Sequence, residues 1–172
     1  IGTQRRGGEG RHIFTLGSDD SLTAADPWAE HEETARPGLP GELHLGMINH
    51  SSLVEGRSVK AAGELQVKDG NLQELSDSSG HYTPTNAMTR QALDHFEGAG
   101  VDLHDVQLKL MDKGTGDRVA MHASAREFMG TQDAMRQRNA IRAAAGEADE
   151  YDLTKPGAVE AQMLDSRARM KL

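Results

Sequence analysis

Titratable and hydroxyl-bearing side chains gather in three short segments in the first half of the chain. His50 is followed by two serines, Glu64 lies in an Ala-Ala-Gly-Glu-Leu segment, and His81 precedes a tyrosine. A histidine changes charge near neutral pH, and a carboxylate can orient it or act as a base where burial raises the carboxylate pKa. If the three segments meet in space, His50, Glu64 and His81 are candidate catalytic residues.

Four further side chains could bind a ligand at the same place, namely Ser51, Ser52, Ser79 and Tyr82. A serine becomes a nucleophile only with a base within hydrogen-bond reach, and a tyrosine adds a stacking ring. A structural corner is the alternative, in which Ser51 and Ser52 at a strand end bond to the backbone and Tyr82 packs with its hydroxyl anchored. The sequence leaves both interpretations open.

No metal site and no resident cofactor are predicted. Cysteine is absent, which excludes a thiol nucleophile and any Cys-ligated zinc or iron–sulfur site. The cluster His31-Glu32-Glu33 lacks a second histidine at helical spacing, so a solvated turn is favoured over a metal site.

The hydrophobic pattern predicts an α+β fold, with a small, mostly antiparallel sheet, one packed helix and a helical C-terminal extension. Asp69-Gly70 between two β-like runs is a strong hairpin signal, because glycine accepts the positive φ of a tight turn. Residues 27–41 contain three prolines and are expected to form a surface loop. The expected strands cover residues 12–16, 21–25, 43–47, 62–67, 72–75, 106–110 and 119–121.

The clearest helix signal covers residues 85–97. Thr85 is a suitable N-cap, the residues Met88, Ala92, Leu93 and Phe96 share one face, and two glycines follow. Two weaker helices are expected from Gly130 or Thr131 to Ala145 and from Ala158 to Met170. Their apolar faces are thin, so they need a partner surface.

Charge divides the chain into unequal parts. The 172 residues carry a net charge of -8, which argues against a duplex DNA binder, and no apolar run is long enough for a membrane span. Residues 130–172 hold 7 of the 19 Lys and Arg and 7 of the 27 Asp and Glu, so the acidic excess lies before them. We therefore predict a flexible lead-in at 1–11, a core domain at 12–129 and a helical extension at 130–172. Since residue 1 is isoleucine and the first residues are polar, we also expect a fragment without a visible signal peptide.

Five segments follow one another in one order at close spacing, namely HSSLVEG at 50–56, AAGEL at 61–65, DG at 69–70, SGHYTPT at 79–85 and VDL at 101–103. Together they resemble the conserved core of the plant IQ-motif-containing (IQM) calmodulin-binding proteins, which reads HSSFLAGG, AAGRL, DG, SGHYxPT and VDL. Leu53 replaces its aromatic residue, Glu64 replaces its arginine, and the dipeptide Ile-Gln occurs nowhere in the chain. The resemblance therefore implies the fold of this core over about residues 12–110, but it does not imply calmodulin binding.

Similar segments occur in bacterial toxin-like and effector-like proteins, and Glu64 makes this copy resemble them more closely. On that resemblance we predict a bacterial effector or toxin-type virulence domain that binds a host or target-cell protein. It would act through a binding surface or a polar pocket around His50, Glu64 and His81. We expect it to be secreted into a host cell without a cleavable signal peptide, or otherwise to be cytoplasmic.

Two alternatives stand beside that prediction. The first is an enzyme, either a hydrolase or an NAD-using transferase. The order of His50, the serines and Glu64 loosely resembles that of ADP-ribosyltransferases, although the spacing between His50 and Glu64 is shorter. The second alternative is a purely structural module of a larger protein.

Overall fold

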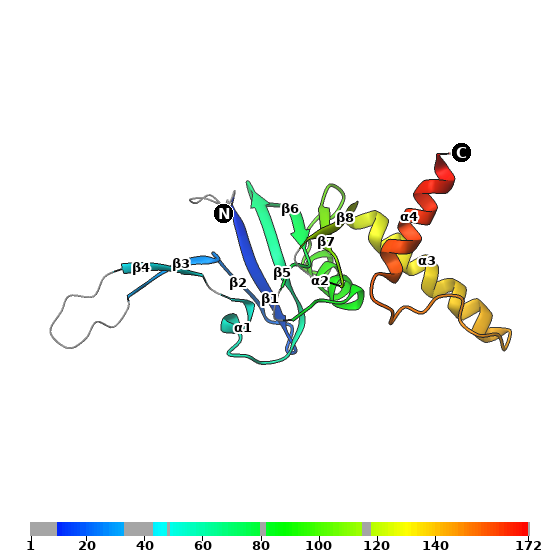
Figure 1. Ribbon diagram of the computed structural model, residues 1–172, viewed down its shortest axis with the longest axis horizontal. Coiled ribbons are helices and arrows are strands. Elements are labelled where there is room, and N and C mark those ends of the chain that lie inside the picture. The colour runs from blue at the N-terminus through cyan, green and yellow to red at the C-terminus, as the bar shows by residue number, and fades with distance from the viewer. Residues whose placement is uncertain (1–9, 33–42, 48, 80–81, 115–117, 172) are drawn as a thin grey trace.

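A six-stranded sheet forms the centre of the protein, and a separate two-stranded hairpin projects from one end of it (Figure 1). The computed structural model describes residues 10–32, 43–47, 49–79, 82–114 and 118–171. Neighbouring strands of the large sheet follow the order β2-β1-β5-β6-β7-β8. These strands are β1 (Arg11–Gly17), β2 (Leu22–Ala25), β5 (Val59–Lys68), β6 (Asn71–Ser76), β7 (Gln107–Met111) and β8 (Val119–Ser124).

Every neighbouring pair of strands is antiparallel except β6 and β7, which run parallel. A parallel pair needs a crossover connection, and helix α2 (Asn86–Gly98) provides it. Helices α3 (Ala125–Ala144) and α4 (Ala158–Met170) lie at the end of the molecule opposite the hairpin (Figure 1). The predicted α+β class, with a mostly antiparallel sheet, one packed helix and C-terminal helices, is confirmed.

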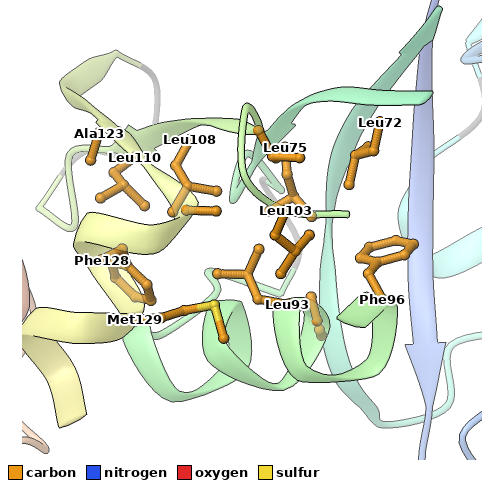
Figure 2. Close-up of a cluster of buried hydrophobic side chains, with 14 of the residues drawn as sticks. Leu72, Leu75, Leu93, Phe96, Leu103, Leu108, Leu110, Ala123, Phe128 and Met129 are labelled. Atoms are coloured by element: carbon orange, nitrogen blue, oxygen red, sulfur yellow. The ribbon is translucent and has the colours of Figure 1, made fainter. Parts of the chain in front are cut away.

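The hydrophobic core fills the space between the sheet and α2 (Figure 2). Leu93 and Phe96 point from α2 toward Leu75 and Leu108 of the sheet, and all four are buried. The Phe96 ring also meets Phe14 of β1 edge to face, with 6.0 Å between ring centroids. Aromatic pairs prefer this edge-to-face arrangement, so it fixes α2 against the middle of the sheet.

Helix α2 begins and ends as its sequence predicts. The Thr85 hydroxyl accepts a hydrogen bond from the Met88 amide at 3.2 Å, which satisfies one of the free amides of the first turn. Gly100 has a φ of +87° just beyond the helix, in the left-handed region where helices commonly end. The hairpin prediction at Asp69-Gly70 is also confirmed, because β5 ends at Lys68 and β6 begins at Asn71.

Two local predictions are wrong. Part of the expected loop at 27–41 is strand β3 (Trp28–Glu32), which pairs with β4 (Leu43–Met47), and residues 33–42 lie outside the described residues. Cross-strand pairing outweighs the turn-forming composition of this segment. The two serines that we expected at a strand end lie instead in a short helix, α1 (His50–Leu53).

Helix α3 starts earlier than the sequence interpretation placed it. It begins at Ala125, because the Ser124 hydroxyl accepts a hydrogen bond from the Glu127 amide at 3.0 Å. A serine followed three residues later by a glutamate is a capping-box pattern. Gly130 therefore lies inside α3, and the division of the chain at that residue stays a prediction. Helix α4 has the bounds that we expected.

No helix in the described ranges is long and apolar enough to cross a membrane. Nor do three or more His, Asp or Glu side chains gather within those ranges as a metal ion would require.

Candidate functional site

The structure brings the segment at His50 against the segment at Glu64. The His50 ring is 8% exposed, and its Nε2–H donates a hydrogen bond to the Gly63 carbonyl at 2.8 Å. Helix α1, which carries His50, also lies against strands β1 and β2. One ring nitrogen of His50 is therefore used in attaching α1 to the sheet.

Gly63 sits where the sheet leaves no room for a side chain. A Cβ atom at this position would lie 2.0 Å from the Ser76 carbonyl oxygen and 3.1 Å from the Phe14 ring. Glycine in a strand often marks such a close approach of a neighbouring backbone. The close approach of the Ser76 backbone thus explains why the residue before Glu64 is a glycine.

The third segment is tied to the loop that follows α1. The Tyr82 hydroxyl donates a hydrogen bond to the Arg57 carbonyl at 2.9 Å. Ser79 is buried, and its hydroxyl accepts a hydrogen bond from the Tyr82 amide at 3.4 Å. These contacts are those of a structural corner, which was one of the two interpretations left open.

The remaining site candidates are more scattered. Glu64 is 30% exposed, and its Oε2 lies 3.7 Å from Arg11 Nη1. The Ser51 carbonyl accepts a hydrogen bond from the Gly56 amide at 2.8 Å, and Ser52 is exposed. His81 lies outside the described residues. The catalytic role of His50, Glu64 and His81 and the ligand-binding role of the serines and Tyr82 stay predictions.

Burial lowers the pKa of His50 below its ordinary value of 6.5, and the bond to the Gly63 carbonyl and the charge of Glu64 oppose that shift. In the unfolded chain the ring binds a proton more readily. Its contribution to stability is thus present above the unfolded pKa and is lost as the pH falls through the folded pKa.

We expect the unfolding free energy to fall more steeply between about pH 7.5 and about pH 5 in the wild type than in His50→Gln. Glutamine can still donate to the Gly63 carbonyl but does not titrate. The difference is at most about 1.4 kcal/mol per pH unit, the limit for one proton. Urea unfolding of both proteins measures it, and parallel pH profiles would contradict the assignment.

A second feature, which sequence reasoning missed, is a cavity of about 650 Å³ beside the first turn of α2. Its walls come from three parts of the chain that are distant in sequence. These parts are residues 77, 79 and 83–87, the turn at 111–114 and the connection at 153–156.

A charged pair forms one wall of this cavity. The Asp77 side chain is 1% exposed and that of Lys113 is 15% exposed. Asp77 Oδ1 accepts a hydrogen bond from the Met111 amide at 2.7 Å, and its Oδ2 accepts one from the Lys113 ammonium. Lys113 also donates to the Pro84 carbonyl at 3.2 Å. Burial raises the pKa of Asp77, and the charge of Lys113 acts in the opposite direction.

Helix α4 contributes a second buried carboxylate behind this wall. Glu160 Oε1 accepts a hydrogen bond from the Asn86 side-chain amide at 2.9 Å and lies 3.9 Å from the Lys113 ammonium. Its Oε2 is buried and has no hydrogen-bond partner among the described residues. Lys113 is thus the cation that faces two buried carboxylates.

The loop before α2, whose Pro84 carbonyl accepts the Lys113 bond, holds a strained residue. Thr83 has a φ of +39° and lines the cavity. A β-branched residue in this region is an outlier, and such strain gathers at ligand and active sites. The sequence offered one usable signal for this site: Asp77 directly follows β6, whose Leu72 and Leu75 are buried, and a carboxylate in that place needs a partner.

Comparison with known proteins confirms the resemblance to the IQM family. Residues 39–89 match the family model described as the IQ motif-containing protein middle domain. The IQ domain-containing protein IQM1 of Arabidopsis thaliana is 35% identical over 74 residues, which are 43% of this chain and 15% of that protein. IQM2 of the same plant is 30% identical over 98 residues, or 57% of this chain and 16% of its own length. No solved structure matches the chain.

The chain spans less than a fifth of the length of these relatives. They are plant proteins, so the prediction of a bacterial effector or toxin domain is wrong, as are secretion, virulence, delivery into a host cell and a host partner. That prediction gave weight to Glu64 in place of arginine. The structure places the Glu64 carboxylate beside Arg11, and the negative charge of Glu64 raises the pKa of His50 against the effect of burial.

Proposed function

We propose that this chain is a ligand-binding module that holds a small organic molecule in the cavity beside the first turn of α2. The cavity itself carries this proposal. Its volume, about 650 Å³, lies within the range of about 300–1,000 Å³ that is typical of small-molecule sites.

The lining supports the proposal. Pro84, Met111, Leu153 and Pro156 supply apolar walls, and a small set of charged and hydroxyl groups lies among them. Small-molecule sites have this composition, since apolar walls contribute affinity and a few polar groups fix the orientation of the ligand.

The energetics of the walls support it as well. A buried ion pair seldom stabilises a fold more than apolar side chains of similar volume would, and a threonine at positive φ costs about 1–3 kcal/mol. Asp77, Lys113 and Thr83 all line the same cavity. Features that are unfavourable for folding, gathered around one cavity, favour a binding role for it.

The relatives add only context. Their names describe them as IQ domain-containing, and the matched segment 39–89 includes the cavity-lining residues 77, 79 and 83–87. Ile-Gln does not occur in these 172 residues, so calmodulin has no place in the proposal. Calcium-loaded calmodulin serves as a comparison probe in the experiment that follows.

The test is a fragment screen by ligand-observed NMR on the full chain, with Ala87→Trp and Gln91→Trp as a matched pair. Both positions are exposed on α2, but only Ala87 lines the cavity. We expect fragments whose binding weakens at least about tenfold in Ala87→Trp, where the indole fills the cavity, and is unchanged in Gln91→Trp. If the two variants bind all fragments alike, the cavity is not the site and the proposal fails. A response to calmodulin without any fragment bound in the cavity would also contradict it.

A further inference from the structure

We infer that the cavity selects organic anions, meaning molecules that carry a carboxylate or phosphate group on an apolar body. This inference rests on the proposed function and adds the chemical class of the ligand. It follows from a count of which polar groups in the walls are already bonded within the protein and which are not.

The carboxylates that line the cavity are already bonded. Both oxygens of Asp77 accept hydrogen bonds, from the Met111 amide and from Lys113. Asp112 accepts from the Gly114 amide at 2.8 Å through Oδ1 and from the Arg118 guanidinium at 2.9 Å through Oδ2. A cationic ligand would meet carboxylates whose charges Lys113 and Arg118 already balance, so it would gain little from them.

Donors, in contrast, remain available. The Lys155 ammonium has no hydrogen-bond or ion-pair partner in the described part of the chain, and its residue lines the cavity. An ammonium has three N–H donors, and Lys113 uses two of them, for Asp77 and Pro84. The third has Glu160 only at 3.9 Å, which is too long for a hydrogen bond. An acceptor on the ligand would therefore find two ammonium groups.

Two further carboxylates, Glu160 and Asp152, lie near the two lysines but are not among the residues that line the cavity. Glu160 has one unbonded oxygen but is not among the lining residues. Hydrogen bonds from the Thr154 hydroxyl and amide lower the pKa of Asp152, and the charge of Lys155 acts in the same direction. The Asp152 carboxylate is therefore already bonded within its own turn. The net charge of -8 arises in residues 1–129, since residues 130–172 carry seven charges of each sign. Solvent screens the distant part of that charge beyond a Debye length of about 8 Å.

The apolar residues that line the cavity require that the ligand also carry an apolar body. Leu153 and Pro156 stand on either side of Lys155 in the sequence, and Pro84 and Met111 face the same space. An inorganic ion would leave these walls without a partner. Residues 111–114 and 153–156 lie outside the match to the family model at 39–89.

The test uses a library in which each scaffold is present as a carboxylic acid, as its primary amide and as a phosphate monoester. A fragment is assigned to the cavity when it binds the wild type but binds at least about tenfold more weakly to Ala87→Trp. Among these we expect acids or phosphates to bind roughly tenfold tighter than the amides, because charge-assisted hydrogen bonds are about twice as strong as neutral ones. The relative affinities of the acid and phosphate arms show which of the two anions fits.

Two lysine variants complete the test. Lys155→Met is expected to abolish most of the preference for acids over amides. Lys68→Met, at an exposed position of β5 away from the cavity, is expected to change neither. If cavity binders show no anion preference, or if Lys155→Met leaves the preference intact, this inference is wrong while the proposed function stands. If no fragment is sensitive to Ala87→Trp, the proposed function itself fails.

Discussion

Gly63→Ala is expected to lower the unfolding free energy by about 3 kcal/mol, the upper end of the usual range for overpacking. The added methyl group would lie 2.0 Å from the Ser76 carbonyl oxygen, a backbone atom that cannot turn away as a side chain can. Strands β5 and β6 would have to separate, and the Gly63 carbonyl that accepts the His50 bond would move with them. Urea unfolding followed by circular dichroism measures the loss.

Gly130→Ala is the matched control. Gly130 lies on the exposed surface within α3, and no atom lies within 4 Å of the added methyl group. Alanine there is expected to raise the unfolding free energy by about 0.5–1 kcal/mol, because glycine is unfavourable inside a helix. If Gly63→Ala lowered the unfolding free energy no more than Gly130→Ala does, the Ser76 carbonyl could not lie as close to residue 63 as the structure places it.

Lys113→Met is expected to lower the unfolding free energy by about 3 kcal/mol, near the lower end of the range for breaking a buried ion pair. Methionine keeps the length of the side chain but leaves the Asp77 and Glu160 carboxylates without their cation. The 15% exposure of Lys113 keeps the loss from being larger. Chemical denaturation of the two proteins at neutral pH measures it.

Asp77→Asn completes a double-mutant cycle with that variant. Asparagine retains an acceptor for the Met111 amide, and Lys113 retains Pro84 and the nearby Glu160, so this single change is expected to be the milder one. The double variant should lose less than the sum of the two single losses, because a neutral residue 77 needs no cation. Additive losses would mean that the pair is not coupled.

The elements that the sequence predicted well are those whose signals are local. Thr85 as a cap and the Asp69-Gly70 turn act within a few residues of themselves, and α2 and the β5–β6 hairpin follow from them. The sheet order could not be predicted in this way. The pairing of Phe14 with Gly63 depends on contacts between distant strands, and the β3–β4 hairpin is inserted between β2 and β5 in a segment with a loop-like composition.

The site was harder to predict than the fold for the same reason. The sequence singled out the segments around His50, Glu64 and Tyr82, and the structure joins them through the Gly63 and Arg57 carbonyls. It gave no indication of the cavity, since Asp77, Lys113 and Lys155 are far apart in the chain. The parallel pairing of β6 and β7 brings Asp77 to Lys113, and the docking of α4 against α2 brings the connection that carries Lys155 to the same cavity.

The insertion between β2 and β5 bears on how fast the protein folds. Strand β1 pairs with β2 through a short turn, but its pairing with β5 joins Phe14 to Gly63, forty-nine positions later. The intervening chain must close into a large loop, at an entropic cost, before that pairing forms. Pairings of high contact order slow folding, so the local hairpins can form early while the central β1–β5 ladder sets the rate at which the sheet is completed.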